Sequence, residues 1–412
     1  MTKLEAMLKY VSEHNDFYKK RIKEYGITNP LEITQWPVLT REELQENRYN
    51  MFSDGYKTKY YSKLLKRQFS SGTSGCPINV YWDYNDYNLS MIPLWRRRLQ
   101  YYGIRPSDKV VKFTMSVYNT NYSNKSIFNY MESPNVLVIN RSCLQDEKKY
   151  EQLIKMLDCF SPKWLYIQPF ILSSLLYYYQ LFNVKPPLSL IYIESVGEVL
   201  SQKLKKDATA FFNVPVANMY GSEEMNCIAY ECPQNIMHIM EDNVYIELQT
   251  SQNEEALHDG EILITNLNNR AMPLIRYNQA DVVRVSKETC PCICGNHFSI
   301  LEIIKGRSRE SFNRENINVN TYLLIEIIDE VNNALKDIIL QFQFSYSTSQ
   351  DTLKCFLQLD SERILWKNIV EKSIKMAFEK KGILSLNFIF IYNDKNNVKE
   401  LELKKTIFTV ED

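Results

Sequence analysis

Short apolar segments alternate with amphipathic ones between residues 110 and 218 of this chain. The apolar segments have the length of buried strands, and the amphipathic segments have that of helices. This alternation predicts a mostly parallel sheet covered by helices on both faces, with ligands bound beyond the carboxyl ends of its strands. The predicted strands are 110–113, 136–139, 164–167, 190–193 and 216–218, and the predicted helices are 148–159, 171–182 and 200–212.

The pattern changes twice after this region. Antiparallel strands are predicted from residue 244, and an α+β unit follows Gly306 and Arg307. A chain of 412 residues with 45% hydrophobic content also exceeds the size at which one core usually suffices. We therefore expect an α/β protein with a large, partly antiparallel N-terminal domain (1–306) and a small, mobile α+β C-terminal domain (307–412). The further strands expected are 261–265, 274–277, 281–285, 338–346, 353–359 and 386–392, and the further helices are 321–336 and 361–381.

The N-terminal part carries several helix signals. Residues 1–25 are predicted to form one amphipathic helix, and Thr40 with Glu43 makes a capping box that begins a helix at Arg41. A long aromatic helix is expected from 84 to 102, closed by Gly103.

A loop rich in hydroxyls and glycines precedes this aromatic helix. Backbone amides and hydroxyls of such a loop can converge on an anion, which is typical of phosphate binding. A strand is predicted after it, at 78–82, so the loop is not a Walker loop, which leads into a helix after a lysine. The alternative is an ordinary surface turn. The loop residues are Ser70, Ser71, Gly72, Thr73, Ser74, Gly75, Cys76 and Pro77.

Composition excludes several classes of protein. The 49 basic and 49 acidic residues balance, which argues against binding to nucleic acid or a membrane surface by bulk charge. No apolar run is long enough for a membrane span, and no signal peptide is visible. Nine cysteines without such a signal indicate a reducing, cytoplasmic environment.

Cysteines and a histidine are concentrated in two short segments. Five residues separate Cys232 from His238, and Cys290, Cys292 and Cys294 alternate along the chain before a glycine. This density fits a tetrahedral Zn²⁺ site. The alternatives are reduced cysteines in a β-turn, and His297 is a further candidate ligand.

Taken in order, these motifs resemble those of the phenylacetate-CoA ligase and capsule-biosynthesis (CapK-like) branch of the adenylate-forming acyl-activating enzymes. The resemblance covers nearly the whole chain, and its strength lies in the order of the motifs rather than in any one of them. It is carried by Ser70 to Pro77, Val196-Gly197-Glu198, Tyr220-Gly221-Ser222-Glu223-Glu224, residues 260–265, Ala271 to Tyr277, Asp281 and Gly306-Arg307.

The resemblance implies that the protein joins a carboxylic acid to the α-phosphate of ATP and then passes the acyl group to an acceptor. The acceptor is CoA, a carrier-protein thiol or an amine, and the alternative is an inactive nucleotide-binding relative with a regulatory role. The resemblance implies that Thr73 and Ser74 bind the phosphates and that Glu224 binds Mg²⁺, with Glu223 as the competing choice. Tyr220 would stack against the adenine, Asp281 would bind the ribose, and Arg307 would bind the ribose or the α-phosphate. The other residues expected around the nucleotide are Gly197, Glu198, Gly221 and Ser222. The catalytic lysine is expected at Lys404, with Lys405 as the second choice.

The resemblance also bears on the metal site and on the acceptor. Some members of the branch hold a structural Zn²⁺ with a Cys-His pair and a Cys-x-Cys pair, which here match Cys232, His238, Cys292 and Cys294 and leave Cys290 spare. The branch usually has a glycine several residues after the Gly-Arg pair, but residues 308–316 contain none. Side chains at Glu315 and Asn316 therefore predict slow transfer to free CoA. The acid pocket is expected near Phe113, Tyr118 and Tyr192, and a homodimer is compatible with these features.

Overall fold

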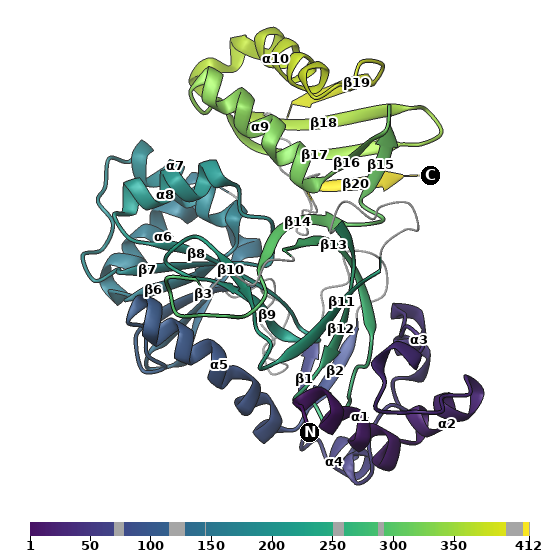
Figure 1. Cartoon of the computed structure of the whole chain (residues 1–412). Coiled ribbons are helices and arrows are strands. Elements are labelled where there is room, and N and C mark those ends of the chain that lie inside the picture. Colours follow the sequence, from purple (N-terminus) through teal and green to yellow (C-terminus); the bar gives the residue numbers. More distant parts are fainter. Residues whose placement is uncertain are drawn as a thin grey trace. The chain divides into compact units, whose positions relative to one another are not determined.

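The computed structural model describes residues 1–69, 78–114, 128–144, 146–249, 259–286, 292–392 and 407–411. The chain divides into two units (Figure 1). The first consists of Met1–Gly103 and Met219–Ile304, and the second of Ile104–Asn218 and Lys305–Asp412. The predicted α/β class is confirmed. The division into domains 1–306 and 307–412 stays a prediction.

The largest sheet has eight strands in the order β10-β9-β8-β7-β6-β3-β5-β4. Strand β3 pairs in parallel with β5 and β6, and β6 with β7, whereas β4, β9 and β10 join in antiparallel fashion. A parallel centre therefore forms where the sequence predicts it. The strands are β3 (Val110–Thr114), β4 (Asn129–Ser133), β5 (Val136–Asn140), β6 (Trp164–Ile167), β7 (Tyr192–Val196), β8 (Val216–Ser222), β9 (Asn226–Glu231) and β10 (Met237–Ile239).

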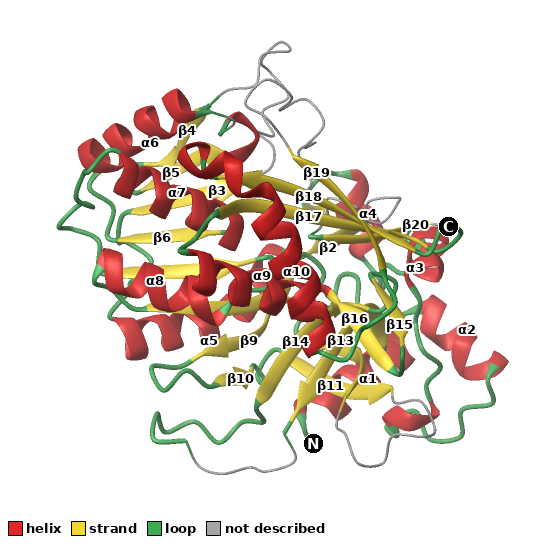
Figure 2. Ribbon diagram, turned by 90° about the horizontal axis from the view of Figure 1, so that it is seen from above, coloured by secondary structure: helices red, strands yellow, loops and turns green. Residues whose placement is uncertain are grey.

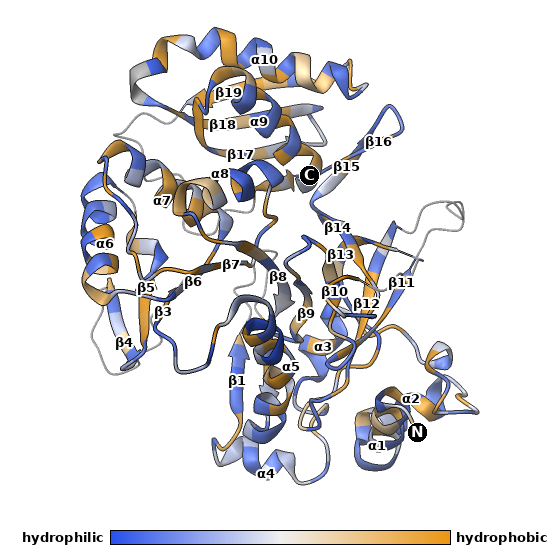
Figure 3. Cartoon of the chain, turned by 60° about the vertical axis from the view of Figure 1, so that its left-hand side comes forward, coloured by the Kyte–Doolittle hydropathy of each residue, from blue (hydrophilic) through white to orange (hydrophobic). Residues whose placement is uncertain are grey.

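Three helices of the second unit cover one face of its strands: α6 (Glu147–Phe160), α7 (Pro169–Leu181) and α8 (Gln202–Phe212) (Figure 2). Buried side chains of the strands, such as Val111, Leu165 and Ile193, share a core with Leu153 and Leu172 of the helices. Along α6, hydrophobic and hydrophilic residues recur turn by turn (Figure 3), as expected for a helix with one buried side.

Strand β7 begins two residues later than the predicted strand 190–193 and continues through Val196. The amide of Leu190 donates to the carbonyl of Pro187 at 3.1 Å, so the chain is still in a turn there. Ser195 and Val196 are consequently strand residues, and the chain leaves the sheet at Gly197.

The first unit begins with two helices, α1 (Lys3–His14) and α2 (Asp16–Glu24), and the predicted single helix over 1–25 is wrong. The break lies at Asn15, whose side chain caps α2 through the amide of Tyr18 and donates to the carbonyl of Met51 at 2.8 Å. The capping box of Thr40 and Glu43 is confirmed at the start of α3 (Arg41–Asn47). The elements that follow η1 (Ile33–Gln35) and α3 are α4 (Tyr56–Tyr61), β1 (Lys66–Phe69), β2 (Asn79–Trp82) and α5 (Tyr84–Tyr102).

Two further predictions hold in this part of the chain. The strand predicted at 78–82 is β2, which pairs in antiparallel fashion with β1 on the other side of the hydroxyl-rich loop. Helix α5 ends at Gly103, which adopts the left-handed conformation with φ of 67°.

The antiparallel region is a four-stranded sheet in the order β11-β12-β13-β14. The sequence predicts separate strands at 274–277 and 281–285, but one strand spans 277–285. Residues 274–276 are outside it because Arg276 adopts a left-handed φ of 49° and its amide donates to the hydroxyl of Thr265. The strands are β11 (Val244–Gln249), β12 (Asp259–Asn266), β13 (Tyr277–Val285) and β14 (Leu301–Arg307).

The C-terminal part of the second unit alternates strands and helices largely as predicted. Its main sheet has the order β19-β18-β17-β20, and the predicted helix 361–381 is divided into a 3₁₀ segment and an α-helix. The elements are β15 (Ser311–Arg314), β16 (Ile317–Asn320), α9 (Thr321–Leu335), β17 (Ile339–Ser347), β18 (Thr352–Leu359), η3 (Ser361–Trp366), α10 (Lys367–Lys380), β19 (Asn387–Tyr392) and β20 (Phe408–Glu411).

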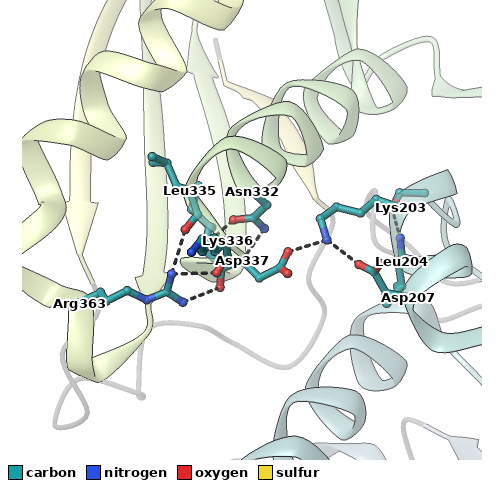
Figure 4. A network of polar contacts seen from close by, with 10 residues as sticks. Lys203, Leu204, Asp207, Asn332, Leu335, Lys336, Asp337 and Arg363 are labelled. Carbon is teal, nitrogen blue, oxygen red and sulfur yellow. Dashed lines mark hydrogen bonds and ion pairs between the residues drawn. The ribbon is translucent and has the colours of Figure 1, made fainter. Parts of the chain in front are cut away.

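Polar contacts link α8 to the end of α9 within the second unit (Figure 4). The ammonium of Lys203 lies 2.5 Å from carboxylate oxygens of both Asp207 and Asp337. The guanidinium of Arg363 donates to the carbonyls of Leu335 and Lys336 at 2.8 Å. These carbonyls at the end of α9 lack partners within the helix, so Arg363 supplies their hydrogen bonds. Because the side chain of Asp337 is 63% exposed, its ion pair contributes at most about 1 kcal/mol.

Candidate functional site

In the first unit, β8 and β13 bring together two of the residues that the sequence singled out. The hydroxyl of Tyr220 donates to Asp281 Oδ2 at 2.7 Å, and the amide of Gln279 donates to the same oxygen at 2.9 Å. Gln279 also lies 2.7 Å from the Tyr220 hydroxyl, so the three side chains form one hydrogen-bonded triangle. An aromatic ring beside an anchored carboxylate can bind a nucleoside through ring stacking and through its ribose hydroxyls.

The backbone next to Asp281 is irregular. The register between β12 and β13 shifts at this point, and Ala280 adopts a left-handed φ of 64°, which is unfavourable for a residue with a Cβ. Bulges of this kind redirect side chains and are common beside functional sites. Gln279 and Asp281, on either side of Ala280, both contact Tyr220.

The turn between β8 and β9 holds two adjacent carboxylates. Glu224 is 4% exposed, whereas Glu223 keeps an exposed surface. Desolvation by the surrounding protein and the negative charge of Glu224, opposed by Lys66, together raise the pKa of Glu223 to about 7. Among the described residues, the buried hydroxyl of Ser222 has no hydrogen-bond partner. Carboxylate oxygens are the ligands that a hard divalent cation such as Mg²⁺ prefers.

Gly221 is required by close packing in the same hairpin. A Cβ at this position would clash with the carbonyl oxygen of Asn226 on β9, where the register between β8 and β9 shifts. The glycine therefore allows the turn with Glu223 and Glu224 to close against β9.

The second unit contains the other described candidates for nucleotide binding. Gly197 follows β7 with φ of 78°, a conformation suited to glycine. Glu198 accepts hydrogen bonds from Arg141 of η2 (Arg141–Cys143) at 3.3 Å and from the amide of Phe170, also at 3.3 Å, at the start of α7. Arg307 lies 3.8 Å from Glu310. Gly197, Glu198 and Arg141 thus gather at the carboxyl ends of β7 and β5, the edge at which parallel sheets bind ligands.

Four potential metal ligands converge in the first unit. One ligand atom from each of Cys232, His238, Cys292 and Cys294 lies within 4.8 Å of all the others. A tetrahedral Zn²⁺ centre, with Zn–S near 2.3 Å and Zn–N near 2.0 Å, has S–S edges of about 3.8 Å and S–N edges of about 3.5 Å. The Sγ atoms of Cys232 and Cys292 are 3.8 Å apart, and Cys294 Sγ is 3.4 Å from His238 Nε2. The donor set therefore fits zinc in both chemistry and size.

The imidazole of His238 is oriented for this role. Its Nδ1 lies 3.4 Å from the carbonyl of Phe298, which favours the tautomer that leaves Nε2 free to bind a metal. Burial lowers the pKa of His238, and this favours the neutral form that a metal requires. Burial opposes ionisation of Cys294, yet hydrogen bonds, first that from Tyr101, lower its pKa.

Several predicted residues lie outside the described residues. These are Ser70, Ser71, Gly72, Thr73, Ser74 and Gly75 of the phosphate loop, both candidate lysines Lys404 and Lys405, the spare cysteine Cys290, and Tyr118 of the acid pocket. Their roles stay predictions. Phe113 and Tyr192 are buried at 1% and 0% exposure, respectively.

The comparisons with known proteins give relatives of the same branch. No protein-family model matches the chain. The phenylacetate-coenzyme A ligase of Thermus thermophilus is 23% identical over 330 residues, which cover 77% of this chain and 71% of that protein. Protein CapK of Staphylococcus aureus is 22% identical over 383 residues, 84% of this chain and 82% of that protein. The predicted resemblance to the phenylacetate-CoA ligase and CapK branch is confirmed.

A solved structure of an acyl-CoA ligase matches the fold of this chain over its whole length. A crystal structure of 2-hydroxyisobutyryl-CoA ligase in the postadenylation state, in complex with R3-HIB-AMP, matches with a TM-score of 0.75 and 17% identity. The match covers 100% of this chain and 88% of that one. Among the described helices, none combines the length and the apolar character needed to cross a membrane.

Proposed function

We propose that this protein activates a carboxylic acid with ATP and transfers the acyl group to CoA. A carboxylate oxygen attacks the α-phosphorus of ATP, the bond to the β-phosphate bridging oxygen breaks, and pyrophosphate leaves. The CoA thiolate then attacks the acyl carbon of the adenylate, and AMP leaves with the electron pair of the broken C–O bond. The names of the curated relatives support CoA as the acceptor, while a carrier-protein thiol and an amine are the other candidates.

The contact between Tyr220 and Asp281 carries this proposal. An adenine ring stacked on Tyr220 would place the ribose within reach of Asp281, whose carboxylate accepts from both hydroxyls in a charge-assisted pair. Gln279 donates to Asp281 Oδ2 and so orients the carboxylate. Fixing the nucleoside in this way aligns the α-phosphate with the incoming acid, which reduces the entropic part of the barrier.

The remaining groups supply charge for the phosphates. Glu224, with Glu223 as the competing choice, would hold Mg²⁺, and a bound Mg²⁺ stabilises charge on the phosphoryl oxygens as a Lewis acid. We also propose that Arg307 binds the ribose or the α-phosphate and that the loop 70–77 binds the β- and γ-phosphates. Lys404, or else Lys405, would be the catalytic lysine, in a domain formed by residues 307–412.

We place the protein in a reducing cytosol, because the described cysteines are all free thiols.

The test is pyrophosphate release from ATP over a panel of aromatic and aliphatic acids, with ATP binding measured in parallel. We expect at least one acid to stimulate release and Glu224→Gln to abolish the stimulation. If nucleotide binds but no acid stimulates release, the protein is instead a non-catalytic nucleotide-binding relative.

We further propose that Cys232, His238, Cys292 and Cys294 hold one structural Zn²⁺. All four coordination positions of a tetrahedral ion would be filled by protein, so the ion would stabilise the fold and take no part in the reaction. It would tie the start of the β9–β10 turn to the segment that precedes β14, two regions about 60 residues apart.

Replacement of Cys292 by serine is expected to lower the free energy of unfolding by about 2 kcal/mol, or the melting temperature by roughly 4–8 °C, because the metal contributes folding energy. The affinity for ATP should change less than about twofold, since metal and nucleotide residues are separate. Calorimetry, metal analysis and ATP titration check this. Cys227→Ser is the control, because Cys227 is a buried cysteine that has no place in the cluster. A folded parent protein that contains no zinc would contradict the site.

A further inference from the structure

We propose that Arg97 and Tyr101, near the C-terminal end of α5, form an outer shell that retains the metal and couples its presence to the docking of this helix. The inference rests on the proposed zinc site and goes beyond it, because α5 supplies no metal ligand. All the residues concerned belong to the first unit.

The hydroxyl of Tyr101 contacts one of the ligand sulfurs. It lies 3.5 Å from Cys294 Sγ, within the range of an O–H···S hydrogen bond. The ring of Tyr101 is nearly parallel to that of Tyr230 on β9, with an interplanar angle of 8° and 6.5 Å between ring centroids. Packing on Tyr230 thus directs the hydroxyl toward the sulfur. A metal-bound thiolate keeps negative charge and accepts such a bond, which holds the ligand in its binding orientation.

Arg97 brings positive charge to the same place. Its guanidinium carbon is 5.8 Å from the ring centroid of Tyr101 and 5.7 Å from that of Phe298, whose carbonyl orients His238. Three thiolates and one neutral imidazole around a divalent zinc ion leave one net negative charge. The cation of Arg97 offsets this charge in a partly desolvated setting, where an uncompensated charge is costly.

The other end of α5 is fixed by bonds that do not involve the metal. Asn226, at the start of β9, donates to the hydroxyl of Ser90 at 2.7 Å, and Asn243 donates to the carbonyl of Ser90 at 2.8 Å. Helix α5 is thus held at Ser90 by amide side chains, and near its C-terminal end by the bond from the Tyr102 hydroxyl to the carbonyl of Glu231 and by the contact of Tyr101 with the metal centre. Removing the metal should loosen only the C-terminal turns of α5.

The first experiment follows metal loss to a chromogenic chelator from the zinc-loaded full chain. We expect Tyr101→Phe to release zinc about 10–100 times faster than the parent, the usual effect of losing an outer-shell partner. Tyr102→Phe is the matched control, because the Tyr102 hydroxyl donates to the carbonyl of Glu231 at 2.9 Å and not to a ligand. Its release rate should stay within about threefold of the parent rate.

Two further readouts separate this role from a general loosening of the protein. In the cobalt-loaded protein, the thiolate-to-metal absorption should move to lower energy in Tyr101→Phe and not in Tyr102→Phe, because the lost hydrogen bond no longer stabilises the sulfur electrons. Metal removal should increase hydrogen exchange in the last turns of α5 and leave α1 unchanged.

The outcomes distinguish the two proposals. A parent that binds neither zinc nor cobalt overturns the metal site itself. A parent that holds metal, with Tyr101→Phe releasing it at the parent rate or at the rate of Tyr102→Phe, overturns the outer-shell role alone. If Tyr101→Phe purifies without metal while Tyr102→Phe keeps it, the result supports the proposal that Tyr101 retains the metal.

Discussion

Replacement of Asp281 by asparagine is expected to lower kcat/KM for ATP by about 100- to 1,000-fold. Two hydrogen bonds from ribose hydroxyls to a carboxylate contribute about 3–4 kcal/mol together, and a neutral amide recovers little of that. Asparagine keeps an oxygen that can accept from Tyr220, which now donates at 2.7 Å, so the local fold should survive. Pyrophosphate release at saturating acid, measured as a function of ATP concentration, checks the prediction.

Deoxynucleotides make this test specific to the ribose. The parent should use 2′-deoxy-ATP and 3′-deoxy-ATP less well than ATP, and Asp281→Asn should lose most of that preference. Asp259→Asn is the control, because Asp259 accepts from Arg284 at 2.7 and 2.9 Å on the same sheet and has no proposed ligand role. It should reduce stability and leave kcat/KM for ATP nearly unchanged. Equal discrimination among the nucleotides in the parent and in Asp281→Asn would remove the ribose role.

Features that depend on neighbours in the chain could be predicted from the sequence. The capping box of Thr40 and Glu43 needs only residues three apart, and the end of α5 needs only the conformational freedom of Gly103. The break at Asn15 could not be predicted in this way. Its side chain is held by the carbonyl of Met51, 36 residues away, and this contact exists only in the folded unit.

The same distinction applies to the candidate sites. Tyr220 and Asp281 are 61 residues apart, and their meeting was predicted from the family resemblance rather than from local pattern. Gln279 was missed because it lies between the two predicted strands, 274–277 and 281–285, so no strand pattern covered it. Arg141 was missed as well, because a lone arginine after a strand has no local feature that identifies Glu198 as its partner.

The segment that lacks the expected glycine forms a tight hairpin. Strands β15 and β16 pair with Arg314 opposite Ile317, so the two-residue turn consists of Glu315 and Asn316. Both adopt left-handed conformations, with φ of 49° and 65°, as a type I′ turn requires. The carboxylate of Glu315 accepts from the amide of Leu384 at 2.8 Å. Glu315 therefore anchors the turn, while the side chain of Asn316 is exposed at its tip.

Replacement of Asn316 by glycine is expected to raise the rate of acyl transfer to free CoA by up to roughly a hundredfold, which corresponds to about 3 kcal/mol of barrier. The resemblance places a glycine here beside the path of the thiol arm, and the asparagine side chain adds bulk to that path. The turn should persist, because glycine adopts a positive φ freely and Glu315 keeps its bonds. Acyl-AMP and acyl-CoA are followed separately with the acid that best supports pyrophosphate release.

Asn235→Gly provides the matched control for this change. Asn235 also adopts a left-handed φ, of 59°, in the turn between β9 and β10, so glycine relieves the same kind of strain there. Both variants should gain a few tenths of a kcal/mol in stability, and only Asn316→Gly should accelerate acyl-CoA formation, with adenylation unchanged in both. If the parent already converts its adenylate to acyl-CoA promptly and Asn316→Gly is no faster, the missing glycine has no bearing on the acceptor. In that case the exposed tip of the β15–β16 hairpin lies away from the route of the thiol.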